Sequence, residues 1–159
     1  MRESVALVVV LVAYALAEAA WLFSMRSTYS GWFQAFSRGP LQLRSIPAAA
    51  LTYVVLLASF YVLVIRSNAP RASSSPSPSP SLAHQVARGA LFGLAVYGVY
   101  NLTNVSTLPG YPWAMVAVDA TWGTVAFGAL AALHALLLRW HVYTWCQKMV
   151  RTPPVDHIF

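Results

Sequence analysis

Two acidic side chains lie inside long apolar stretches of this sequence, where an ionised carboxylate is costly. Glu18 lies in an apolar run over about residues 4–25, and Asp119 lies in another over about residues 113–138. A charge in the membrane interior costs a few kcal/mol, so such residues usually face a partner or a water-filled cavity. Two buried carboxyl groups that lie close together also favour keeping at least one proton, as a proton relay requires.

The spacing of the two acids places them at one depth if both runs cross a membrane as helices. Glu18 precedes the end of its run at Met25 by seven residues, and Asp119 follows the start of its run at Trp113 by six. At about 1.5 Å per residue these offsets are roughly 10 Å and 9 Å, on helices of opposite direction. We therefore expect both carboxyl groups in the same half of the membrane, the outer half in the orientation argued below.

Further polar side chains fall at the same level. Tyr97, Tyr100, Asn101 and Asn104 follow steps of three and four, which places them on one helical face. A Trp follows each acid by three residues, close to one helical turn, and we expect each Trp to shield its own acid from lipid. The expected polar layer, which would hold a proton or a ligand, comprises Glu18, Trp21, Tyr97, Tyr100, Asn101, Thr103, Asn104, Asp119 and Trp122. A lock of hydrogen bonds between packed helices explains the same residues equally well.

The composition identifies the elements that must position this layer. The 159 residues are 58% hydrophobic and only 9% charged, whereas soluble domains contain about 25% charged residues. We therefore expect an all-α integral membrane protein with one domain over 1–159, a bundle of four transmembrane helices with short interfacial helices. The predicted spans cover about 4–25, 46–65, 84–103 and 113–138. A cleavable signal peptide is the less favoured interpretation of the first run, because apolar residues continue past Ala17 to Phe23.

The segments between the spans have distinct compositions. Alternating Ser and Pro over 67–82 predicts a disordered linker, although Ser-Pro pairs are also sites that kinases modify. Trp32, Phe33 and Phe36 have helical spacing and predict a short interfacial helix in the first loop. Residues 139–159 predict an interfacial cytosolic tail. Gly89 and Gly93 form a pair of small residues that permits close helix contact.

The basic residues predict the orientation of the chain. Ten Lys or Arg residues oppose four Asp or Glu residues, and they lie near the ends of the apolar runs. Seven of them lie in the amino terminus, the second loop and the tail, three lie in the first loop, and none lies in the third. Because basic residues gather on the cytosolic side, both termini are expected there. This distribution does not suggest a nucleic-acid partner.

Paired motifs in the third and fourth spans resemble a known family. The sequence from Arg88 to Leu108 contains Gly89, Gly93, Tyr97, Tyr100 and a Leu102-Thr103-Asn104 motif, and the fourth span contains Asp119, Trp122 and Gly123. This pattern is similar to the predicted membrane proteins grouped as Domain of Unknown Function 2177, and Glu18, Trp21, Leu22, Pro47 and Tyr53 fit its first two helices. The resemblance implies four helices, with Asp where this chain has Glu18 and Asn101. It implies a fold and no particular activity.

Transport of a small solute, coupled to protons, is the leading functional hypothesis. Glu18 and Asp119 would hold the protons, and a homo-oligomer or a membrane-protein partner would complete the path through the lipid bilayer. The alternative is a structural or assembly subunit in which the layer fixes helix packing. A membrane-embedded hydrolase is less favoured because no nucleophile motif, metal-ligand cluster or phosphate loop is present. No cofactor or metal is expected, and His134 is expected to be a packed or interfacial residue rather than a relay.

Overall fold

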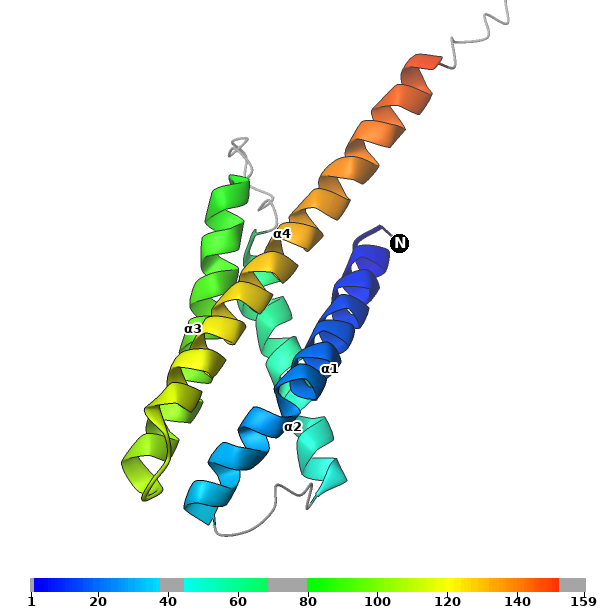
Figure 1. The fold of residues 1–159 in the computed structure, drawn as a ribbon. Helices are drawn as coiled ribbons and strands as arrows, with labels where there is room; N and C mark the ends of the chain where they lie inside the picture. The colour runs from blue at the N-terminus through cyan, green and yellow to red at the C-terminus, as the bar shows by residue number, and fades with distance from the viewer. Residues whose placement is uncertain (1, 38–44, 69–79, 152–159) are drawn as a thin grey trace, which may run out of the picture.

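The computed structural model describes residues 2–37, 45–68 and 80–151, with backbone only at Arg2, at Asn68 and over 141–151. These residues form the all-α fold that the composition predicts. Four α-helices follow in order: α1 (Arg2–Ser37), α2 (Ile46–Phe60), α3 (Leu82–Thr107) and α4 (Trp113–Arg151). In Figure 1, α4 is the longest helix and lies between α3 and α1, while α2 crosses behind them.

Three of these helical segments are long and apolar enough to cross a membrane. They are Glu3–Ser37, Ile46–Ile65 and Trp113–Trp140. The 26-residue helix α3 is long enough but less apolar, because it contains His84, Gln85 and Arg88 as well as the expected polar layer. The prediction of four transmembrane helices therefore stays a prediction, whereas the all-α membrane fold is confirmed.

Local sequence signals explain where α2 and α3 begin. The Ser45 side chain accepts a hydrogen bond from the Ala48 N–H at 3.3 Å, and the Ser81 side chain accepts one from the His84 N–H at 3.2 Å. Each serine thus caps a helix start whose N–H groups lack intrahelical partners. Pro47 lies in the first turn of α2, where its missing N–H is not needed.

Helix α2 ends in an altered helical geometry. It continues as a π-helical turn η1 (Tyr61–Ile65) and a 3-10 turn η2 (Arg66–Asn68). The Leu63 carbonyl there accepts hydrogen bonds from the Arg88 guanidinium at 2.9 Å and from the Ser67 hydroxyl at 2.6 Å. The Arg88 contact therefore joins the end of α2 to α3.

Close packing of α3 on α4 forms the centre of the bundle. A Cβ atom at Gly93 would overlap the backbone of Gly123, and one at Gly89 would overlap the Phe127 carbonyl. The predicted close contact at Gly89 and Gly93 is therefore present, and its partner surface is α4. Next to it, an apolar core surrounds Phe127, whose side chain is fully buried.

Two predicted segments differ from the structure or lie outside it. Trp32, Phe33 and Phe36 belong to the last turns of α1, which continues without a break to Ser37 instead of ending near Met25. The predicted tail over 139–159 begins as a continuation of α4 to Arg151. Most of the predicted linker over 67–82 lies outside the described residues, as do residues 152–159.

Candidate functional site

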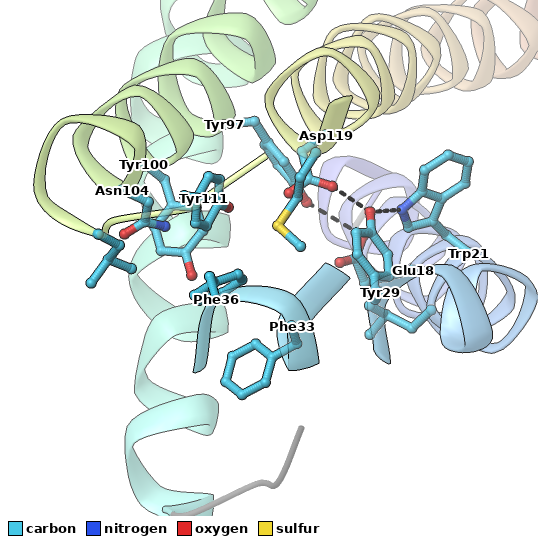
Figure 2. Close-up of a pocket in the computed structure, with 13 residues that line it drawn as sticks. Glu18, Trp21, Tyr29, Phe33, Phe36, Tyr97, Tyr100, Asn104, Tyr111 and Asp119 are labelled. Atoms are coloured by element: carbon cyan, nitrogen blue, oxygen red, sulfur yellow. Dashed lines mark hydrogen bonds between the residues drawn. The ribbon is translucent and has the colours of Figure 1, made fainter. Parts of the chain in front are cut away.

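A cavity of about 280 Å³ lies at the end of the bundle where α3 turns into α4 (Figure 2). The turn passes through Gly110, whose φ of +82° suits glycine, and the Tyr111 N–H donates to the Leu108 carbonyl at 3.2 Å. Two acids and seven aromatic residues line the cavity, and the remaining lining residues include Asn104, Leu108 and Met115. The acids and aromatic residues are Glu18, Asp119, Trp21, Tyr29, Phe33, Phe36, Tyr97, Tyr100 and Tyr111.

Glu18 is held by neutral donors from two other helices. Its side chain is buried, and its Oε2 atom accepts hydrogen bonds from Trp122 Nε1 at 2.9 Å and from the Tyr97 hydroxyl at 3.4 Å. The Tyr97 hydroxyl also lies 3.2 Å from the Tyr14 hydroxyl. Within the described part of the chain, no hydrogen bond reaches Glu18 Oε1. This oxygen is therefore left for a proton, water or ligand.

Asp119 is held by donors from α1 and α3. The Tyr29 hydroxyl donates to Asp119 Oδ1, and Asn101 Nδ2 donates to Asp119 Oδ2 at 3.1 Å. Asn101 is fully buried, and its Nδ2 also donates to the Tyr97 carbonyl at 2.9 Å. The Tyr111 hydroxyl donates to Asn101 Oδ1 at 2.6 Å. Burial raises the pKa of the Tyr111 phenol, so this hydroxyl keeps its proton and remains a donor.

The rings of Trp21 and Trp122 stack on each other, and the N–H group of neither Trp donates to the acid that precedes it in sequence. The rings of Trp21 and Trp122 are parallel within 3°, with centroids 4.4 Å apart. Trp122, which follows Asp119 in sequence, donates to Glu18 of α1. Trp21, which follows Glu18, donates to the Tyr29 hydroxyl at 3.0 Å, and Tyr29 in turn donates to Asp119. Neither Trp therefore donates to the acid that precedes it by three residues: Trp122 bonds across to α1, and Trp21 bonds to Tyr29. The shielding of each acid from lipid by its own Trp stays a prediction.

Glu18 and Asp119 are connected through a network of hydrogen bonds, although no hydrogen bond joins the two carboxyl groups directly. Tyr97 donates to Glu18 through its hydroxyl and accepts from Asn101 through its carbonyl, and Asn101 also donates to Asp119. None of the described residues that line the cavity is basic. All four donors to the acids are neutral, so the described part of this site contains no charge that would neutralise two carboxylates.

Most residues of the expected polar layer meet at this cavity. Six of them line it, whereas Asn101 and Trp122 are not among the lining residues but donate hydrogen bonds to Asp119 and Glu18. The six are Glu18, Trp21, Tyr97, Tyr100, Asn104 and Asp119. Thr103 lies elsewhere: it is exposed, and its carbonyl accepts hydrogen bonds from Ser106 and Thr107 within α3.

Three tyrosines of the network were missed by the sequence analysis. Tyr14 precedes Glu18 by four residues, so helical spacing alone could have placed it on the same face. Tyr29 lies beyond the predicted end of the first span, and eleven residues, close to three turns, separate it from Glu18. Tyr111 lies in the turn after α3, where no periodic signal applies.

Two of the other cavities along the described helices are lined by ionisable side chains. One of about 230 Å³ lies between Glu18, Tyr97 and the Thr52–Tyr53 part of α2, so Glu18 borders two cavities. The other, of about 150 Å³, lies near the opposite end of the bundle and is lined by Glu3, Arg66 and His134 among others. His134 is buried there, as expected for a packed residue. Within the described ranges no group of three or more His, Cys, Asp or Glu side chains could hold a metal ion.

Comparison with known proteins identifies the family of this chain. A family model described as "Predicted membrane protein (DUF2177)" matches residues 4–136, which include every described residue of the cavity and its network. The chain belongs to this family. The match to DUF2177 spans most of the chain, so the resemblance found in the motifs is confirmed. No curated protein and no solved structure matches the chain.

Membership of this family supports a membrane location but does not indicate an activity. The description of DUF2177 is that of a predicted membrane protein, which agrees with the three long apolar helices. Its description names no reaction, substrate or partner. Any function must therefore be argued from the site itself.

Proposed function

We propose that this DUF2177 protein is a carrier that couples protons to the movement of a small solute, with Glu18 and Asp119 as its proton-carrying groups. The observation that supports the proposal is a cavity with two carboxyl groups and no basic residue among its described lining side chains. In a membrane such groups need a proton or a bound cation, because an uncompensated charge is costly there.

The hydrogen bonds of the two acids suit a group that alternates between charge states. Each carboxyl accepts two hydrogen bonds from neutral donors, which lowers the cost of the ionised form. Glu18 Oε1 has no hydrogen bond within the described residues and could hold the proton of the neutral form. The cavity supplies access for a solute, and Glu18 borders a second hollow toward α2. A carrier that exchanges a proton for a solute requires these properties together.

The proposed arrangement in the membrane has four spans, with both termini in the cytosol and the cavity in the outer half. Its support is the excess of basic residues at the termini and in the second loop, combined with the position of the cavity beside the turn between α3 and α4. Pro109 in that turn is exposed, so Pro109→Cys in a Cys146→Ser background should react with an impermeant thiol reagent added outside intact cells. Labelling only after the membrane is opened would overturn this orientation.

Proton flux in liposomes tests the carrier directly. The intact protein should move protons along an imposed gradient between about pH 5 and about pH 8, and Glu18→Gln and Asp119→Asn should each lower the flux at least about tenfold. Glu3→Gln is the matched control, because Glu3 is an exposed carboxyl outside the network, and it should leave the flux unchanged. Unchanged flux in Asp119→Asn would overturn the proposed role of the acids.

A structural or assembly subunit is the second candidate, and a specific observation favours it. Among the described residues, every side-chain nitrogen or oxygen that is completely shut off from solvent has a hydrogen-bond partner, and Glu18 Oε1, which has none, keeps some exposed surface. The bonds to Glu18 and Asp119 join α1, α3 and α4, as a lock between helices would. No flux in any sample, lower thermal stability in both acid variants and one co-purifying stoichiometric partner would favour this candidate.

A further inference from the structure

We propose that the solute bound in this cavity is an organic cation, a compact amine or quaternary ammonium compound with an apolar group attached. The inference rests on the proposed function in one respect only, because it names the substrate class of the same cavity. It requires binding at the cavity and does not require transport. Three properties of the described residues support it: the sign of the charge, the aromatic lining and the size.

The charge of the lining favours a cation over an anion or a neutral solute. Glu18 and Asp119 both line the cavity, and the other described lining residues are neutral. An anion would meet carboxyl groups with no basic residue to bind it. The positive charge of a cation would neutralise an ionised carboxylate, as a proton does. The total charge of the site therefore stays the same when one proton leaves for each cation that enters.

The aromatic lining favours an organic cation over a metal ion. Figure 2 shows Glu18 and Asp119 on one side of the cavity, with Phe36 and Tyr111 across from them. The rings of Phe36 and Tyr111 pack with centroids 5.2 Å apart and form a continuous aromatic wall. Aromatic faces attract ammonium groups, and such walls are used to bind quaternary ammonium ligands. The described lining is mostly aromatic and apolar, whereas a metal ion such as Ca²⁺ binds about six to eight oxygen ligands, and within the described residues no group of three or more His, Cys, Asp or Glu side chains could hold one.

The size and remaining lining of the cavity restrict the cation. Its volume of about 280 Å³ lies at the lower limit of small-molecule sites, which begin at about 300 Å³. Leu22, Leu108 and Met115 complete the lining with apolar surface. The cavity therefore suits an amine with one ring or a short alkyl chain rather than a large polycyclic cation.

Binding of benzyltrimethylammonium to the detergent-solubilised full chain tests the inference. Trp21 lines the cavity, so binding should change tryptophan fluorescence, and calorimetry supplies the affinity independently. Neutral N,N-dimethylbenzamide and anionic benzenesulfonate, which are of similar size, should bind at least about tenfold more weakly. Equal binding of the neutral compound, or no binding of the cation, would overturn the proposal. This comparison uses the unaltered protein, so no folding defect affects it.

Variants then locate the site. Glu18→Gln and Asp119→Asn should each weaken binding of the cation at least about tenfold, and Phe36→Leu should weaken it about fivefold through the loss of an aromatic face. Glu3→Gln should bind as the unaltered protein does. Thermal unfolding of each variant verifies that it is folded. Cation binding that none of the three cavity variants weakens would place the site elsewhere and overturn the assignment.

The outcomes separate this inference from the proposed carrier. Charge-selective binding that depends on Glu18 and Asp119, with no proton flux either without solute or along a gradient of benzyltrimethylammonium, would support the cation site and overturn the carrier. Proton flux that depends on the same acids, without charge-selective binding, would support the carrier and overturn the cation site. In the combined case, addition of benzyltrimethylammonium to unbuffered protein should release protons, and neither acid variant should release as many.

Discussion

Two regions of the same helix pair, α3 and α4, are built in opposite ways. Around Gly93 and Gly123 the backbones approach so closely that a single added Cβ would overlap the other helix. Toward the turn between them, Tyr97 and Asn101 stand between the helices, and their polar groups bond to Glu18 and Asp119. The first region is filled and apolar, whereas the second leaves a cavity of about 280 Å³.

The difference shows how one helix pair can provide both rigidity and a site. Lipid chains are as apolar as the core side chains, so membrane helices associate through close packing and hydrogen bonds rather than through apolar burial. The glycine contact supplies the packing at one level, which allows the polar level to remain partly open. The variants below test this division of roles, beginning with the largest expected effect.

Gly93→Leu should disrupt the packed region most strongly. Its side chain would have to displace the Gly123 backbone, and overpacking against a backbone should cost at least about 3 kcal/mol of unfolding free energy. Thermal unfolding in detergent measures the effect. Gly98→Leu on the same helix is the control, because a Cβ at Gly98 meets nothing within 4 Å. Its stability should be unchanged or slightly higher, since leucine favours helix over glycine by about 0.8 kcal/mol. Equal stability of the two variants would contradict the close contact.

Phe127→Ala should have the next largest effect. Phe127 is fully buried, and its ring packs against Tyr14, Phe60 and Phe92 with centroid distances of 5.3, 4.9 and 5.1 Å. Truncation should lower the unfolding free energy by about 2 kcal/mol, because the cavity term remains even where lipid provides an apolar alternative. Val125→Ala, at a position 60% exposed on the same helix, should change it by less than about 0.5 kcal/mol. A similar loss in both would show that the core is loosely packed.

Sequence spacing was sufficient for much of this architecture. Gly89 and Gly93 predicted a close helix contact because small residues one turn apart remove side chains from one face. Glu18 and Asp119 were assigned to a common level from their distances to the ends of the apolar runs, and they line one cavity, although α1 itself continues past Met25 to Ser37. Both inferences depend on positions along single helices, which the sequence determines directly.

Relations between helices were not accessible in the same way. The rotation of α1 against α4 decides that Trp122 donates to Glu18 and that Trp21 reaches Asp119 only through Tyr29. Tyr29 was missed because the first helix was predicted to end near Met25, although the structure continues it to Ser37. Apolarity indicates where a helix can cross a membrane, but it does not indicate how far the helix extends beyond.

Tyr111→Phe should produce the smallest effect of the three and tests the polar region by itself. The substitution removes the hydroxyl that donates to the buried Asn101 Oδ1 at 2.6 Å. It should lower the unfolding free energy by about 1 kcal/mol, because one buried acceptor loses its partner. Tyr61→Phe is the matched control, since the Tyr61 hydroxyl makes no hydrogen bond within the described part of the chain, and its stability should not change.

The size of the Tyr111→Phe effect, measured by thermal unfolding in the same detergent, decides whether the two regions differ in energy as well as in form. Hydrogen bonds between membrane helices average about 0.6 kcal/mol in double-mutant cycles. A cycle that combines Tyr111→Phe with Asn101→Ala should therefore give a coupling of this order. A coupling above about 2 kcal/mol would make the polar region as important for stability as the packed core around Phe127. The network would then act chiefly as a lock between helices, and the case for a site that exchanges protons would weaken accordingly.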